Sequence, residues 1–160
     1  MSNPSVTAPV VLIAAMSHDR VIGSKSGMPW SLPEEYDRYL ATVRQGVVVM
    51  GRKSYEIFGA DLDPHRCVVV THREKWGSAC VAPSVEGALR QAAVTGETIF
   101  VAGGASVYQQ ALPLADRMYL SVIDGDFQGD TWFPAFDPAD WRIERQERQA
   151  GYSFFDYRRV

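Results

Sequence analysis

The sequence contains few of the residues that bind metals or form cross-links. Its 160 residues include two cysteines and three histidines. Cys67 and Cys80 do not belong to a Cys-x-x-Cys pair, and the histidines (His18, His65 and His72) lack the spacing of metal ligands. We therefore expect no metal site, and we expect reduced thiols in a cytoplasmic protein rather than a disulfide framework.

Long apolar segments and blocks of like charge are also missing. The apolar stretch from Val10 to Met16 is too short to span a bilayer, and no Lys or Arg precedes it, so neither a membrane span nor a signal peptide is expected. The net charge of −3 argues against nucleic acid or an anionic membrane as the main partner. A few basic residues can still bind a small anionic ligand. We expect a monomer with a small-molecule substrate.

The residues that are present have the composition of one globular domain, with 46% hydrophobic and 22% charged residues. We expect this domain to span residues 1–160, with 1–9 as a loose extension. The apolar pattern predicts strands at 10–15, 47–50, 67–71, 80–82, 98–102 and 118–123, helices at 32–44, 51–58, 85–94 and 105–112, and a hairpin at 141–157. Ser31 and Ser84 are expected to cap helices. This alternation predicts an α/β fold: a mostly parallel central sheet, helices on both faces, and an antiparallel C-terminal hairpin.

Three predicted strands end in residues suited to phosphate. They lead into Gly51-Arg52-Lys53-Ser54, Gly103-Gly104-Ala105-Ser106 and Thr71-His72-Arg73. Glycine lets a phosphate approach the backbone, and a new helix points free N–H groups at it. Each signal alone is also explained by a tight turn, a solvated helix start or a surface loop, and no complete GxGxxG or Walker motif is present. Together they favour a dinucleotide, and a basic strand end without Asp or Glu favours NADP over NAD.

A pair of acidic residues, Glu34 and Glu35, lies in the first predicted helix. At about 100° per residue, the larger apolar and aromatic side chains of this helix form one stripe. The stripe consists of Leu32, Tyr36, Tyr39, Leu40 and Val43. Glu34 falls opposite the stripe, in solvent, whereas Glu35 falls at its border. Burial there would raise the pKa of Glu35 and let its carboxyl group hold or relay a proton near neutral pH.

The simpler interpretation of Glu35 is a first-turn acid stabilised by the helix dipole. The preceding loop favours a catalytic role instead, because Met28 and Trp30 place a large apolar side chain and an indole N–H just before the helix. These groups would cover one side of a site. Trp30 is also compatible with ordinary core packing. Pattern alone therefore leaves both interpretations of Glu35 open.

Five ordered segments resemble dihydrofolate reductases. They are residues 12–23, 28–35, 49–56, 102–108 and 129–134, and the resemblance extends from about Val10 to the C-terminus. It implies the fold of that family and an enzyme that uses NADPH to reduce 7,8-dihydrofolate to 5,6,7,8-tetrahydrofolate. In that reaction a hydride is transferred to C6 of the pterin while N5 takes a proton.

The resemblance also implies residue roles. Glu35 would grip the pterin amino group and N3 and favour protonation at N5, with Ser121 behind it, while Asp130 would tether the mobile loop that carries Met28. The implied catalytic residues are Glu35, Trp30, Tyr108 and Met28. The implied substrate contacts are Ile13, Glu35, Tyr36, Tyr39, Phe58, His65, Arg66, Ala102 and Ser121. The implied NADPH contacts are Ala15, Ile22, Gly23, Gly27, Gly51, Arg52, Lys53, Ser54, Thr71, His72, Arg73, Gly103, Gly104, Ala105, Ser106 and Val107.

The sequence departs from the family pattern at the position of the arginine that clamps the glutamate tail of folate. A gapless comparison places His65 there, with Arg66 next. Ala105 also stands where a third glycine is common. Two alternatives therefore remain: an NADPH-dependent reductase of another pterin or of a pyrimidine, as in riboflavin synthesis, and a non-catalytic NADPH-binding module.

Overall fold

The computed structural model describes residues 8–23 and 28–160. Its helices are α1 (Pro33–Val43), α2 (Arg52–Phe58), α3 (Val85–Ala93) and α4 (Ala105–Ala111). Its strands are β1 (Val10–Ser17), β2 (Val21–Gly23), β3 (Val47–Gly51), β4 (Cys67–Val70), β5 (Cys80–Ala82), β6 (Ile99–Val101), β7 (Arg117–Ile123), β8 (Thr131–Trp132), β9 (Trp141–Gln149) and β10 (Tyr152–Arg159). Every predicted helix and strand is therefore present, with bounds that differ by a few residues.

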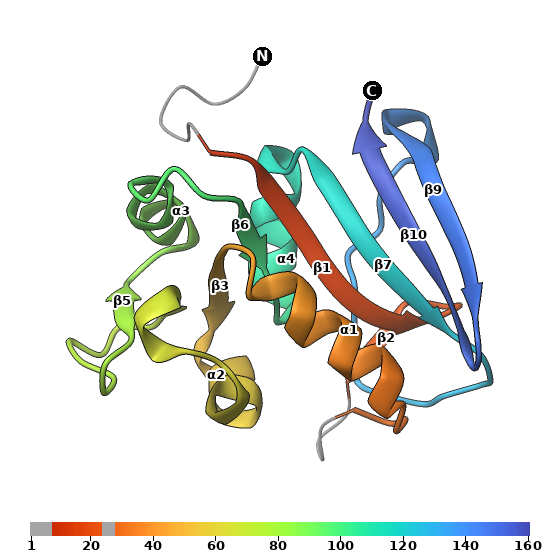
Figure 1. Ribbon diagram of the computed structural model, residues 1–160, viewed down its shortest axis with the longest axis horizontal. Helices are drawn as coiled ribbons and strands as arrows, with labels where there is room; N and C mark the ends of the chain where they lie inside the picture. Colours follow the sequence, from red (N-terminus) through yellow and green to blue (C-terminus); the bar gives the residue numbers. More distant parts are fainter. Residues whose placement is uncertain (1–7, 24–27) are drawn as a thin grey trace.

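One eight-stranded sheet runs through the molecule in the order β5-β4-β3-β6-β1-β7-β10-β9 (Figure 1). The strands from β5 to β7 pair in parallel, β10 pairs antiparallel with β7, and β9 pairs antiparallel with β10 at the edge of the sheet. The expected α/β fold with a C-terminal hairpin at the sheet edge is thus confirmed. β1 is apolar along almost its whole length because it lies in the middle of the sheet and is covered on both faces.

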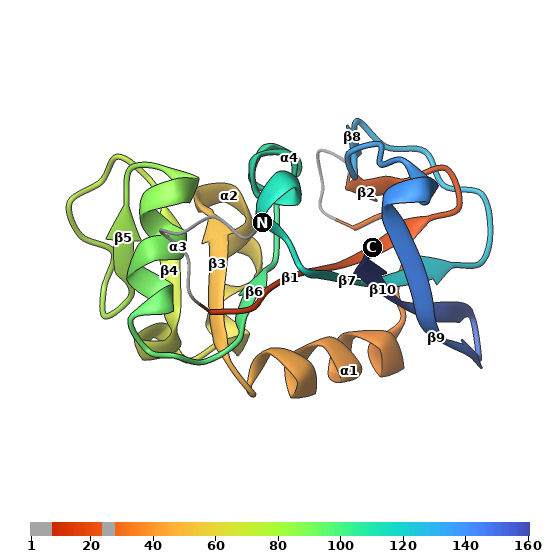
Figure 2. The same ribbon diagram turned by 90° about the horizontal axis from the view of Figure 1, so that it is seen from above.

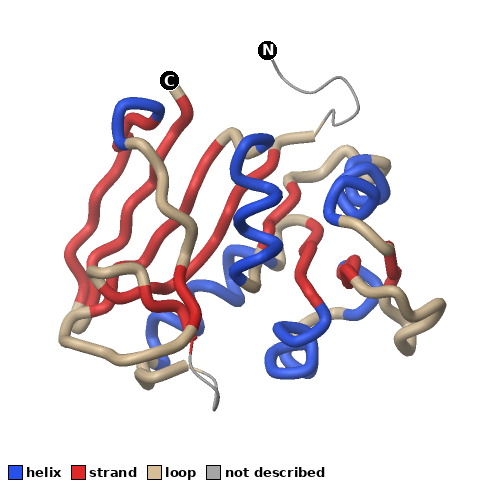
Figure 3. The backbone as a smooth tube through the Cα atoms, turned by 180° about the vertical axis from the view of Figure 1, so that it is seen from behind, coloured by secondary structure: helices blue, strands red, loops and turns tan. Residues whose placement is uncertain are grey.

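Helices cover both faces of this sheet. Figure 2 shows α1 on one side of the sheet and α4 on the other, and Figure 3 shows α4 crossing the face opposite α1. Alternate residues of β1 divide between two cores: Leu12 packs with apolar residues of α3 and α4, whereas Ile13 packs with Val43 and Tyr39 of α1. The site described below lies on the second of these faces.

Of the two serines that the sequence predicted as helix caps, one caps its helix and the other does not. The Ser84 hydroxyl accepts a hydrogen bond from the Gly87 N–H and caps α3, as expected. The expectation for Ser31 was wrong: the residue before α1 is Leu32, which makes no side-chain cap. Pro33 begins the helix instead, because its fixed φ suits the first helical position and it has no N–H to satisfy.

Two features lay outside the prediction. β2 and β8 form a small separate sheet, which the pattern did not reveal because each strand is only two or three residues long. At the N-terminus, Ala8 is buried and the Pro9 carbonyl accepts a hydrogen bond from the Ile99 N–H, so the chain is already packed at these two residues of the expected loose extension. Residues 1–7 lie outside the described part.

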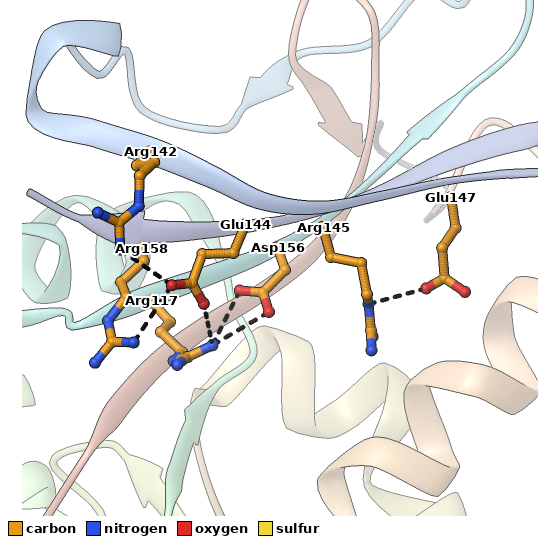
Figure 4. A network of polar contacts seen from close by, with 7 residues as sticks. All are labelled: Arg117, Arg142, Glu144, Arg145, Glu147, Asp156 and Arg158. Carbon is orange, nitrogen blue, oxygen red and sulfur yellow. Dashed lines mark hydrogen bonds and ion pairs between the residues drawn. The ribbon is translucent and has the colours of Figure 1, made fainter.

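Charged side chains of β7, β9 and β10 form a network at the hairpin (Figure 4). Arg117 contacts Asp156 at 3.2 Å and Glu144 at 3.4 Å. Arg142 and Arg158 also contact Glu144, at 3.1 and 3.3 Å. The network joins the edge of the sheet to its parallel part through side chains as well as through the backbone ladder.

Candidate active site

A cavity opens beside the carboxyl ends of β1 and β6, between α1 and α2. It encloses about 600 Å³ of space, part of it open to solvent. Its lining residues are Ile13, Ala14, Ala15, Ile22, Met28, Glu35, Tyr36, Tyr39, Ser54, Phe58, Ala102, Gly104 and Tyr108. All of them except Ala14 are among the predicted site residues. The fold therefore gathers side chains from five separate stretches of sequence into one apolar pocket.

Glu35 is the one residue with a carboxyl group among the described residues that line this cavity. It is 9% exposed, whereas the neighbouring Glu34 is exposed. Ser121 of β7 donates a hydrogen bond to Glu35 Oε2 at 3.2 Å. Burial raises the pKa of Glu35, and the Ser121 hydroxyl and the charge of Arg38 only partly oppose this effect. The group is thus poised to hold a proton at a higher pH than an exposed glutamate.

Tyr108 fixes the inner wall of the cavity. Its hydroxyl donates a 2.7 Å hydrogen bond to the Ile13 carbonyl, which joins α4 to β1. Its ring packs against Phe133 with the centroids 5.0 Å apart. Burial raises the pKa of Tyr108 well above its ordinary value, so the phenol remains protonated and keeps donating.

Two of the predicted phosphate turns meet at this end of the sheet. The Gly51 N–H donates to the Gly103 carbonyl at 2.8 Å, so the starts of α2 and α4 lie together. Neither helix has a side-chain cap. Gly103 has φ +111°, and a Cβ there would lie 3.0 Å from Ser54 Oγ, so only glycine fits. The Gly103-Gly104 peptide is cis. Ala105 is the first residue of α4, where a methyl group is accommodated.

The basic residues around these turns have different partners. Arg52 pairs with Glu56 one helical turn on, at 3.2 Å, and Lys53 is exposed.

After β4, the buried Thr71 accepts a hydrogen bond from the Arg73 N–H at 3.2 Å. The Arg73 guanidinium lies over the Trp76 ring, 4.3 Å from its centroid. His72 and Ser106 are exposed, and Val107 is buried beside Gly51. Because β4 pairs with β3, the third predicted strand end adjoins the turn after β3.

Known proteins match the chain over nearly its whole length. A family model described as dihydrofolate reductase matches residues 9–159. Dihydrofolate reductase type 3 of Salmonella typhimurium is 39% identical over 144 residues, which cover 88% of each chain. Dihydrofolate reductase HdrB of Haloferax volcanii is 37% identical over 161 residues, which cover 93% of this chain and 82% of its own. The chain belongs to the dihydrofolate reductase family.

A solved structure in the dihydrofolate reductase family shares the fold. Dihydrofolate reductase from Enterococcus faecalis, complexed with NADP(H) and RAB-propyl, matches with a TM-score of 0.85 and 25% sequence identity, over 94% of this chain and 96% of its own. The predicted family and fold are thereby confirmed. Dihydrofolate reductases are oxidoreductases, so this protein is an oxidoreductase as well.

A second cavity lies at the C-terminal end of α1. It is lined by Val43, Arg44, Val48, Asp61, Leu62, Asp63, Arg66 and Cys67. Arg66 thus reaches a cavity, whereas His65 is an exposed residue that lines neither one. The Arg66 guanidinium donates to the Gly46 carbonyl and contacts Glu97 Oε1 at 2.7 Å. Arg44 and the two aspartates were missed by sequence reasoning, because nothing in the helix pattern marks the end of α1 as a cavity wall.

Some predicted site residues lie elsewhere. Trp30 does not line the cavity; it packs edge-on against Phe127, with the centroids 5.3 Å apart, in a cluster that includes Ala15. Gly23 ends β2, and its carbonyl accepts a hydrogen bond from the Asp130 N–H at 3.1 Å. That hydrogen bond joins the end of β2 to the residue before β8. Gly27 lies outside the described residues.

Within 8–23 and 28–160, no group of three or more His, Cys, Asp or Glu side chains is arranged to hold a metal ion. No helix in the same ranges is long and apolar enough to cross a membrane.

Proposed function

We propose that this protein reduces 7,8-dihydrofolate to 5,6,7,8-tetrahydrofolate with NADPH. The observation that carries the proposal is Glu35, a buried carboxyl group in an apolar cavity beside the glycine turn. A pterin offers an amino group and N3 as a pair of neighbouring donors, which matches the two oxygens of one carboxylate. Family membership and the names of the relatives support this choice of substrate.

The walls of the cavity suit a flat ring. Tyr36 and Tyr39 of α1 stack with each other at a centroid distance of 5.8 Å, and Phe58 of α2 lies on the other side. These side chains would hold the pterin and exclude water, which strengthens the interaction with Glu35. The raised pKa of Glu35 then favours delivery of a proton to N5, directly or through water.

The residues present fit NADPH. The space above Gly103 and Gly104 would be filled by a Cβ, and the helix starts beside them have no side-chain caps, so backbone N–H groups are available to a pyrophosphate. Arg52, His72 and Arg73 would hold the further phosphate of the adenosine half. Ala15, Ile22 and Ala102 would line the nicotinamide end. When bound, NADPH supplies the hydride that C6 of the pterin accepts.

The second cavity favours a substrate with a glutamate tail over the pyrimidine substrate of the alternative reductase. Arg44 and Arg66 line this cavity, and arginine is a residue type that suits carboxylates. We assign the role of tail clamp to Arg66 rather than His65, because Arg66 is the one that faces a cavity. Its guanidinium also contacts Glu97.

The proposal is tested by NADPH oxidation with dihydrofolate and, in parallel, with a tail-less dihydropterin. We expect turnover of both. Glu35→Gln should lower turnover at pH 7 by about 100-fold or more, because removal of a positioned acid typically has that effect, with partial recovery at acidic pH as the substrate protonates itself. Glu34→Gln is the matched control, since that side chain is exposed on the same turn. The proposal would be overturned if NADPH were oxidised with neither of the two substrates.

A further inference from the structure

One row of paired residues crosses the sheet from the first cavity to the hairpin. Ala15 of β1 pairs with Ser121 of β7, which pairs with Phe154 of β10, which in turn pairs with Glu147 of β9. Directly paired residues of neighbouring strands point to the same face of a sheet. Because Ser121 donates a hydrogen bond to Glu35, the whole row lies on the face that α1 covers.

α1 contacts this row at two points, one helical turn apart. Glu35 accepts the hydrogen bond from Ser121, and Arg38 contacts the two outer members of the row. The Arg38 guanidinium lies 3.8 Å from the centre of the Phe154 ring and donates a 2.7 Å hydrogen bond to Glu147 Oε2. Residues three apart on a helix are neighbours on its surface. The side chain that joins α1 to the hairpin is therefore next to the buried acid.

The contact between Arg38 and Glu147 is partly shielded from water. The side chain of Arg38 is 25% exposed and that of Glu147 is 37% exposed, and the Phe154 ring covers one side of the guanidinium. Glu147 also contacts Arg145 at 3.2 Å, as Figure 4 shows, so two arginines share one carboxylate. A shielded pair of this kind holds its side chains more firmly than a fully exposed ion pair does.

The position of the Glu35 carboxyl group depends on the placement of α1. Among the described residues, Ser121 is the one hydrogen-bond donor to this group. A displacement of about 1 Å in a catalytic group can lower a rate by about 100-fold. A tilt of α1 away from the sheet would move Glu35 off Ser121. The contacts of Arg38 oppose such a tilt, because they lie one turn further along the helix, on the adjoining strands β10 and β9.

We propose that Arg38 is a positioning residue for Glu35: it joins α1 to β9 and β10, holds the carboxyl group against Ser121 and keeps a positive charge beside it. The inference rests on the proposed function, because Glu35 is the acid of that reaction. Burial raises the pKa of Glu35 and the Ser121 hydroxyl lowers it; among the described residues, Arg38 is the cation whose charge lowers it further. Glu147 competes with Glu35 for this charge.

Other titratable groups surround this pair. They are Tyr39 of α1, Tyr108 of α4, Arg145 and Glu147 of β9, and Tyr152 of β10. Burial raises the pKa of Tyr39 and of Tyr108, and the charge of Glu35 adds to the rise, so both phenols stay neutral near pH 7. The hydrogen bond from Arg38 lowers the pKa of Glu147, which therefore stays ionised. An effect of Arg38 on the pH dependence near neutrality is thus expected to act through Glu35.

The test measures turnover of dihydrofolate from pH 5 to pH 9 in Arg38→Met and in Glu147→Gln. We expect Arg38→Met to lower the maximum of kcat by about tenfold, since a displacement of Glu35 smaller than 1 Å is enough for such a loss. Loss of the cation should also raise the pKa of Glu35, so the alkaline limb of the profile should move to higher pH. Glu147→Gln should move this limb to lower pH, because it removes a negative charge and leaves that of Arg38.

Two further variants separate this role from a general loss of structure. Arg38→Lys keeps the charge, so it should restore most of kcat and the position of the alkaline limb. Arg145→Met is the matched control: it removes the other arginine from Glu147, but its side chain is 59% exposed and belongs to the hairpin rather than to α1. An equal fall in kcat in Arg145→Met would overturn the proposal. An alkaline limb that stays in place or moves to lower pH in Arg38→Met would overturn it as well.

A measurement without turnover separates this inference from the proposed function. The carbon-13 signal of the Glu35 carboxyl group, assigned by its loss in Glu35→Gln, follows the titration of that group. A midpoint at higher pH in Arg38→Met and at lower pH in Glu147→Gln would support the role of Arg38 even if no dihydrofolate were reduced. Equal midpoints in these two variants and the unmodified protein would overturn it even in an active enzyme. Turnover by the unmodified protein reports on the proposed function alone.

Discussion

Glu35 shows how a residue proposed for chemistry can be unfavourable for folding. The residue is 9% exposed, and its carboxyl group has one hydrogen-bond donor among the described residues, Ser121. A buried carboxylate with so few partners destabilises the folded state at neutral pH, and its raised pKa expresses that penalty. The helix pattern predicted that Glu35 and Glu34 would differ in exposure. It did not predict Ser121 as the partner, because that residue lies 86 positions away.

We expect Glu35→Gln to raise the melting temperature at pH 7. Because the pKa of Glu35 is higher in the folded state than in the unfolded state, the folded state binds the proton more tightly. Stability therefore falls as the pH rises from the ordinary pKa of glutamate to the raised value, and each unit of that interval corresponds to about 1.4 kcal/mol.

Thermal unfolding from pH 4 to pH 8 checks this prediction. The gain in the variant should be full at the upper end of the range and should disappear at the lower end, where the glutamate is protonated in both states. Glu34→Gln should show no such gain. A variant that melts below the unmodified protein at pH 7 would mean that the charged Glu35 stabilises the fold.

The C-terminal hairpin shows how elements were predicted in type but not in detail. Alternation in the sequence indicated two antiparallel strands, and β9 and β10 are those strands. The pairing shifts register after Asp156, which pairs with Arg145, while Tyr157 pairs with Ile143. Glu144 is therefore the extra residue of a bulge, which aims its side chain at Arg117. A bulge depends on the facing strand, so the pattern of one strand does not reveal it.

Arg117→Met is expected to destabilise the hairpin by about 1–3 kcal/mol at pH 7, because it leaves Asp156 buried without its main partner. Burial already raises the pKa of Asp156, and Arg117 opposes the rise. Without Arg117 the pKa rises further, so the loss of stability should shrink as the pH falls and Asp156 is protonated.

Urea unfolding at pH 7 and at pH 4 measures both effects. Arg142→Met is the control at the same network, since its side chain is 65% exposed and its pair with Glu144 should contribute much less to stability. Equal losses for the two variants would contradict the special position of Arg117.

At the scale of the whole molecule, the site depends on the order of strands in the sheet. β6 lies between β3 and β1, so the glycine turn after β6 lies beside the end of β3 and the open end of β1. The first cavity collects residues from position 13 to position 108. A ligand that binds there contacts segments from much of the chain, so its binding free energy should stabilise the entire fold.

We therefore expect NADPH to raise the melting temperature more than NADH does at equal concentration. At 100 times the dissociation constant, a ligand adds about 2.7 kcal/mol. Replacing both His72 and Arg73 by Ala should remove most of the difference between the two dinucleotides. Arg90→Ala is the control, because Arg90 pairs with Glu86 on the surface of α3. Equal responses to NADPH and NADH in the unmodified protein would contradict the assignment of these residues to the extra phosphate.

The sequence by itself determined the alternation of strands and helices, the family and, through the family resemblance, all but one of the residues that line the first cavity. These features follow from local periodicity and from motifs a few residues long, which a single segment carries within itself. Only the tertiary structure decided that Arg66 rather than His65 faces a cavity, that Trp30 packs away from the site, and that Arg38 reaches Glu147. Each of these depends on the distance between segments remote in sequence, and that distance is set when the layers pack together.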